Sequence, residues 1–97
     1  MRPTRTWRPY DPTWLVELAK EQYPEQPWLH QALANCTRCL QESKAYICFA
    51  NPERPNQPGS EWQFRSNIQL ESKKEGPLVL DVLEDGRIGG VEIIKRI

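Results

Sequence analysis

Cysteine and histidine side chains are the first residues whose types and spacing could do chemistry. Cys36-Thr-Arg-Cys39 has the spacing of many metal and redox sites, and His30 and Cys48 are further candidate ligands. The apolar pattern predicts that Cys36 and Cys39 lie within a helix, with Cys36 central on its apolar stripe and His30 turned toward solvent. A zinc site needs ligands that converge, and a redox pair needs a helix N-terminus. We therefore expect buried structural thiols, no metal and no cofactor.

His30 is also the only histidine, so a hydrolase of the Ser/His/Asp or Cys/His type would have to use it. Its neighbours Gln31 and Asn35 supply neither a nucleophile nor an orienting carboxylate. We expect a solvated surface histidine, and the sequence favours a protein that is not an enzyme.

Carboxylates gather near the C-terminus, where residues 75–92 hold five acidic residues and one basic residue. Asp81 and Glu92 are predicted to be diagonal neighbours on one face of a hairpin, across Gly90. Such a pair can do acid/base chemistry or hold a divalent cation, and it can equally form a solvated or partner-binding acidic surface. Because no third ligand accompanies the pair, we favour a protein partner. The acidic candidates for partner binding are Asp81, Glu84, Asp85 and Glu92.

The segment FANPERPNQPGSEWQF, residues 49–64, carries a proline at every third position from Pro52 to Pro58. Its spacing satisfies two overlapping P-x-x-P patterns, which favour polyproline II and could serve as a ligand for an aromatic groove. A chain of 97 residues leaves little room for a linker between two domains. We expect a stiffened loop between two strands that contacts a partner. The predicted contact residues in and beside this loop are Tyr46, Arg54, Asn56 and Gln57.

The N-terminal stretch RPTRTWRPY interleaves basic and aromatic residues, a pattern that can grip single-stranded nucleic acid. The alternative function is therefore a small nucleic-acid-binding accessory protein. We favour an arm, residues 1–12, that lies back on the domain with two aromatic rings covering the edge of the core. The residues of the nucleic-acid alternative are Arg2, Arg5, Trp7, Arg8 and Tyr10.

Length, charge and composition favour one folded domain, residues 1–97. The chain has 13 basic and 13 acidic residues, so no overall field steers it toward nucleic acid or an anionic membrane. No apolar run approaches the roughly 20 residues that span a bilayer, and the N-terminus lacks the apolar segment of a secretory signal. Three cysteines, an odd number, indicate thiols in a reducing compartment. We expect a cytoplasmic protein.

Apolar periodicity predicts two helices followed by about four strands. The first helix runs from Trp14 to about Tyr23 with Thr13 as its N-cap, and the second runs from about Trp28 to Ser43. We expect an α+β fold, in which both helices pack on one face of a roughly four-stranded antiparallel sheet, in the order α-α-β-β-β-β.

Four segments predict the strands. Residues 44–50 alternate between two covered faces, and in residues 61–72 the residues Trp62, Phe64, Ile68 and Leu70 share one side. Residues 78–94 form a hairpin with a two-residue type I′ turn at Asp85-Gly86, where both residues need positive φ. The expected pairs are Glu84 with Arg87, Leu80 with Val91 and Leu78 with Ile93, with Ile88 and Leu83 on the opposite face.

The hairpin LVLDVLEDGRIGGVEII resembles the closing segment of an uncharacterised family of very small bacterial proteins. The matching residues are Asp81, Asp85, Gly86, Arg87, Gly90 and Glu92. The whole layout, with WLVELAKEQY, an aromatic-rich centre and this hairpin, is similar in style to small bacterial toxin-immunity proteins. That resemblance implies a cytoplasmic α+β domain that binds a toxin, for example a nuclease, and occludes its active site.

Overall fold

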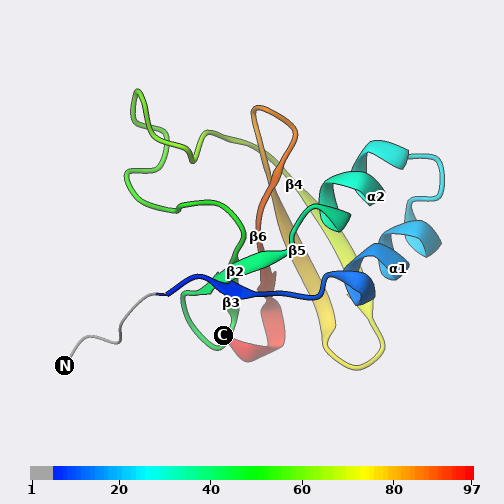
Figure 1. Cartoon of the computed structure of the whole chain (residues 1–97). Helices are drawn as coiled ribbons and strands as arrows, with labels where there is room; N and C mark the ends of the chain where they lie inside the picture. Colours follow the sequence, from blue (N-terminus) through cyan, green and yellow to red (C-terminus); the bar gives the residue numbers. More distant parts are fainter. Residues whose placement is uncertain (1–5) are drawn as a thin grey trace.

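Residues 6–97 form an antiparallel sheet of six strands and two helices. Figure 1 shows the two helices next to each other beside the sheet. The structure is a computed structural model that describes residues 6–97. The strand order in the sheet is β1-β2-β3-β6-β5-β4. The α+β class is confirmed, but the expected count of about four strands is too low, because β1 and β2 were not predicted. The elements are β1 (Arg8–Pro9), α1 (Thr13–Gln22), α2 (Pro27–Ala34), β2 (Arg38–Gln41), β3 (Tyr46–Cys48), β4 (Phe64–Ser72), β5 (Gly76–Leu83), β6 (Ile88–Ile93) and the 3₁₀ turn η1 (Ile94–Arg96).

The N-terminus of α1 is closed by Asp11 rather than by the predicted cap Thr13. Thr13 is the first helical residue, and Pro12 occupies the cap position without a side-chain hydrogen bond to the helix. The backbone N–H and the hydroxyl of Thr13 both donate to the Asp11 carboxylate, at 3.0 Å and 2.6 Å. A carboxylate suits this end of a helix because it satisfies an orphan donor and complements the helix dipole. Within residues 6–97, no helix is long and apolar enough to cross a bilayer.

The second helix ends at Ala34, so the prediction of a helix from about Trp28 to Ser43 is wrong in its second half. Asn35 closes α2, and residues 38–41 form β2 instead. The apolar spacing of Cys36 and Leu40 fits a helix locally. Residues 38–41 nevertheless form a strand, because a strand can make cross-strand hydrogen bonds with both β1 and β3 and a helix cannot. Leu40 consequently lies on the opposite face of the sheet from Cys36.

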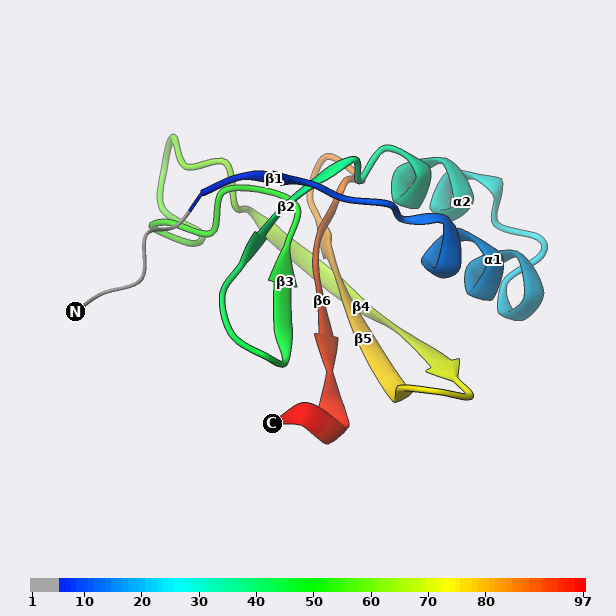
Figure 2. The same ribbon diagram turned by 60° about the horizontal axis from the view of Figure 1, so that its bottom comes forward.

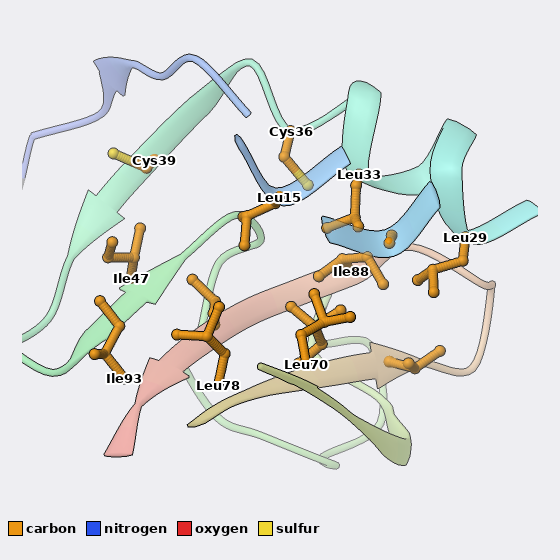
Figure 3. Packing of buried hydrophobic residues seen from close by; sticks show 14 residues of the cluster. Leu15, Leu29, Leu33, Cys36, Cys39, Ile47, Leu70, Leu78, Ile88 and Ile93 are labelled. Carbon is orange, nitrogen blue, oxygen red and sulfur yellow. The ribbon is translucent and has the colours of Figure 1, made fainter. Parts of the chain in front are cut away.

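The main core lies between the helices and the sheet. Figure 3 shows Leu15, Leu29 and Leu33 of the helices directed toward Leu70 and Leu78 of the strands, and all five are fully buried. The helical residues recur at the spacing of one helix face, and the strand residues at the spacing of one sheet face. Apolar burial on this scale is the main stabilising contribution to a domain of this size.

A second, smaller cluster lies on the other face of the sheet. It contains Trp62, Leu83, Leu40 and Cys48. Trp62 was expected to share a face with Phe64, Ile68 and Leu70, but an irregularity in β4 between Phe64 and Ser66 changes the alternation. Trp62 is therefore buried away from Leu70, and Phe64 is exposed.

The β5–β6 hairpin keeps the predicted pairs Leu80–Val91 and Leu78–Ile93. The turn is not type I′, because among its residues only Gly86 has positive φ. The N–H of Gly86 donates to the carbonyl of Leu83, and the N–H of Leu83 donates to the carbonyl of Arg87, at 2.9 Å each. The turn is therefore longer by one residue, and a register shift after Asp81 moves Ile88 into the main core, where it was not expected.

Candidate functional site

The face of the sheet that the helices do not cover brings together three of the predicted partner-binding residues. Both helices lie on the same side of the sheet (Figure 2), and the opposite side carries alternate residues of β3, β6, β5 and β4. We call this surface the open face. Its members are Tyr46, Asn67, Gln69, Glu71, Val79, Asp81 and Glu92.

Strand register places the open-face residues side by side. Asp81 is paired with Gly90, and Val79 is paired with Glu92. Asp81 and Glu92 are therefore diagonal neighbours, which confirms the sequence-based expectation. Tyr46 of β3 is paired with Glu92 on its other side.

Two side chains hold the Asp81 carboxylate in place. The hydroxyl of Tyr46 donates to Oδ2 of Asp81, and Nδ2 of Asn67 donates to Oδ1 at 2.8 Å. Gly90 lies beneath the Tyr46 ring, and a Cβ at this position would be 3.2 Å from Cε1 and from the hydroxyl oxygen of Tyr46. The missing side chain of Gly90 thus allows the ring to reach Asp81 across β6. The carboxylate is a preorganised hydrogen-bond acceptor on rigid strands.

Charge on the open face is negative. Its ionisable residues other than Tyr46 are Glu71, Asp81 and Glu92, all of them acidic. Burial raises the pKa of Tyr46 above its ordinary value, and the hydrogen bond to Asp81 and the charge of that carboxylate raise it further. Tyr46 therefore stays protonated near neutral pH and acts as a donor. This arrangement can orient a carboxylate toward a cationic group that approaches from outside.

The hairpin turn holds the other two acidic candidates, Glu84 and Asp85, at the end of the β5–β6 ribbon rather than on the open face. The Asp85 carboxylate accepts from the backbone N–H of Arg87 at 3.0 Å and from its Nε at 2.7 Å. These hydrogen bonds, together with the charge of Arg87, lower the pKa of Asp85 despite an opposing effect of burial. Glu84 and Asp85 are both exposed, but the Asp85 carboxylate is engaged in closing the turn.

We call the segment between β3 and β4 the proline loop. Its own hydrogen bonds order it, and it lies against the hairpin turn. The backbone N–H of Asn56 donates to the carbonyl of Trp62 at 2.8 Å, and its Oδ1 accepts from the N–H of Phe64 at 2.9 Å. The carbonyl of Gln57 accepts from the Gln63 side chain at 2.7 Å. Of the three predicted loop contacts, Asn56 and Gln57 therefore have roles within the loop, and Arg54 is exposed.

The aromatic residues of the basic arm are engaged within the fold. Trp7 packs beside the second cluster, and the Arg38 guanidinium lies 4.6 Å from the centre of its ring. Tyr10 lies 5.1 Å from Phe49 between ring centres, and its hydroxyl accepts from Nε1 of Trp14 at 2.8 Å. This packing leaves little aromatic surface for base stacking.

The basic residues of the arm are only partly described. Arg8 is exposed and belongs to β1, which pairs with β2, so the arm lies back on the sheet where it is described. Arg2 and Arg5, the other basic candidates of the nucleic-acid alternative, lie outside the described residues.

The cysteines lie in separate places. Cys36 and Cys39 are buried in the main core, and Cys48 is buried on the opposite face of the sheet. Burial raises the pKa of the Cys36 thiol to about 12 and also raises that of Cys39. His30 is half-buried rather than fully solvated, with Nε2 2.8 Å from the carbonyl of Tyr23. Within residues 6–97, no three His, Cys, Asp or Glu side chains are placed to share a metal ion.

Sequence reasoning missed Asn67, which holds Asp81 from the neighbouring strand. The alternating pattern of residues 61–72 places Asn67 on the outward side of the strand, and this position was the sign in the sequence that Asn67 could belong to a surface site. The pairing of Asn67 with Asp81 depends on the register between β4 and β5, which the chain order does not specify.

No protein-family model matches the chain, and no curated protein and no solved structure matches it.

Proposed function

We propose that this protein is a non-enzymatic protein-binding domain, most concretely an immunity- or antitoxin-like inhibitor that occludes the active site of a partner toxin. The observation that carries the proposal is the Asp81 carboxylate, held by Tyr46 and Asn67 on the acidic open face. The strands present these side chains in fixed positions, which lowers the entropy lost on binding.

The charge of the open face favours a basic partner surface. Nucleases bind phosphates with Lys and Arg side chains, so an inhibitor that covers such a site gains from complementary carboxylates in association rate and in specificity. Asp81 and Glu92 supply that charge, and half-buried Tyr46 supplies an aromatic anchor beside it. Because both oxygens of Asp81 already accept one hydrogen bond, an incoming guanidinium meets a carboxylate that is already oriented.

The loop and the hairpin turn extend the proposed contact surface at one end of the molecule. Arg87 Nη1 lies 3.5 Å from Oε2 of Glu61, so the turn and the end of the loop are joined by an ion pair. Arg54 and Glu84 are exposed on this end, where a partner can reach them. We place the protein in the cytoplasm, where its buried thiols stay reduced, and we assign no cofactor to it.

The protein encoded beside this chain in its genome is the first partner to test. Co-expression of the two should yield a stoichiometric complex, and this chain should abolish the toxicity or nuclease activity of its neighbour in a dose-dependent manner. A neighbour without toxic activity, together with no stoichiometric protein partner from the source organism, would overturn the proposal.

A further inference from the structure

An extra residue in β4 places Phe64 on the side of the sheet that the helices do not cover. Between the pairs Phe64–Leu83 and Ser66–Val82, β4 has one more residue than β5, which is a β-bulge. Paired residues lie on the same side of a sheet, and Leu83 belongs to the cluster opposite the helices. With regular alternation, Phe64 would instead share the helix side with Ser66.

Hydrogen bonds to the proline loop and the hairpin turn hold this part of β4 in place. The backbone N–H of Phe64 donates to Oδ1 of Asn56 at 2.9 Å, and the N–H of Glu84 donates to the carbonyl of Gln63 at 2.7 Å. Phe64 is 39% exposed, although large apolar side chains are usually buried. Bulges often aim a side chain at a binding site, and an aromatic ring fixed in an exposed position is available to a partner.

Phe64 borders the Asp81 carboxylate. Because Phe64 is paired with Leu83, it is the diagonal neighbour of Asp81 on β5. Such neighbours are about 7–8 Å apart, a distance that an aromatic side chain can span. Tyr46 reaches the same carboxylate from β3, on the other side of β5 in the strand order. Asp81 therefore lies between two aromatic side chains.

The Asp81 carboxylate has no cation beside it. Asp81 is half-buried, and its two hydrogen-bond donors, Tyr46 and Asn67, are neutral. Among residues 6–97, no basic side chain lies within 4.0 Å of this carboxylate. Each carboxylate oxygen accepts one hydrogen bond and has a second lone pair for another donor. The site can therefore accept a cationic donor from outside the chain.

We propose that Asp81, Tyr46 and Phe64 form a binding site for an arginine side chain of the partner. The inference deepens the proposed function and rests on it, because it takes the open face as the contact surface. A guanidinium is planar, donates two parallel hydrogen bonds to a carboxylate and stacks on aromatic rings. The compact, strongly hydrated ammonium of lysine lacks this planar geometry. The site consequently distinguishes arginine from lysine, which negative charge alone does not do.

NMR titration of the full chain with two capped peptides, hexaarginine and hexalysine, tests this selectivity at equal peptide charge and equal ionic strength. We expect hexaarginine to bind about fivefold more tightly, the range of a cation–π contact at an exposed site. Its addition should shift the side-chain amide signals of Asn67 and the backbone amide signal of Gly90. Equal affinity for the two peptides, or shifts confined to other parts of the chain, would overturn the proposal.

Substitution of the exposed ring tests the role of Phe64. Phe64→Leu keeps an apolar side chain but removes the aromatic face, so the preference for hexaarginine should fall to about twofold or less. Trp28→Leu is the matched control, because Trp28 is 44% exposed and lines a hollow on the helix side with Ile68 and Val82. This control should keep the full preference. An unchanged preference in Phe64→Leu, or an equal loss in Trp28→Leu, would overturn the proposal.

The peptide titrations do not require the toxin, so they separate this inference from the proposed function. If the chain inhibits the protein encoded beside it but shows no preference for hexaarginine, the arginine site is overturned and the proposed function stands. If hexaarginine is preferred through Phe64 but no toxic partner is found, the arginine site stands and the inhibitor function fails.

Discussion

Hydrogen bonds connect three residues of the open face across neighbouring strands. Tyr46 and Asn67 come from different strands, and both donate to Asp81. Gly90 makes this possible by the absence of a side chain. The type and spacing of Asp81 and Glu92 were visible in the sequence, but their hydrogen-bond partners were not, because these partners are set by strand order and register.

Removal of the Tyr46 hydroxyl should weaken the fold in a pH-dependent way. Tyr46→Phe should cost about 1 kcal/mol near neutral pH, the usual contribution of one hydrogen bond. The pKa of Tyr46 is raised in the folded state, so the original protein keeps this stability below about pH 10 and loses it as the unfolded chain ionises above that pH. Urea unfolding from pH 8 to 11 should show a shallower decline for Tyr46→Phe. If the free energy of unfolding fell equally with pH in both proteins, the raised pKa of Tyr46 in the folded state would be contradicted.

An added methyl group at Gly90 should disturb the same group of residues. In Gly90→Ala the new Cβ would be 2.8 Å from the backbone oxygen of Ile47, which cannot move without shifting β3, and we expect a loss of about 1–3 kcal/mol. Gly76→Ala is the control, since its Cβ meets only Cδ of Lys95 at 3.6 Å, an ordinary contact, and only its positive φ is unfavourable. Partner binding should weaken in Gly90→Ala and not in Gly76→Ala. Equal effects of the two substitutions on binding would show that partner binding does not require the hydrogen bond from Tyr46 to Asp81.

At the scale of elements, local pattern predicted α1, β3, β4 and the β5–β6 hairpin, and it failed where tertiary pairing decides. The segment after Asn35 has helical apolar spacing, yet residues 38–41 pair with two strands that are distant in the chain. The irregularity near Arg65 could not be predicted either, and it separates Trp62 from the face of Leu70.

The proline loop keeps its shape through Asn56, whose φ is 64°. Asn56→Gly removes the side-chain bond to the N–H of Phe64 and should cost about 1 kcal/mol. Asn56→Ala also forces a residue with a Cβ into the left-handed region and should cost about 1–2 kcal/mol more. Urea unfolding of the two variants measures the difference. If Asn56→Ala were as stable as Asn56→Gly, the left-handed conformation would not be required.

The overall charge of zero conceals an uneven distribution of charged residues along the chain. The main core holds the helices against one face of the sheet, and the opposite face presents carboxylates. The uneven charge was evident from the sequence. That Asp81 and Glu92 lie on a face without helices, whereas Glu84 and Asp85 lie at the end of the hairpin, required the structure.

A binding measurement with charge-neutral variants shows whether the open face binds a basic partner. Titration calorimetry with the partner isolated from the genomic neighbourhood should give a dissociation constant at least about tenfold weaker for the double variant Asp81→Asn/Glu92→Gln. The matched control Glu17→Gln/Glu21→Gln, which removes two exposed carboxylates from α1, should bind like the original protein. Unchanged binding of the open-face variant, or equal weakening by the control, would contradict the claim.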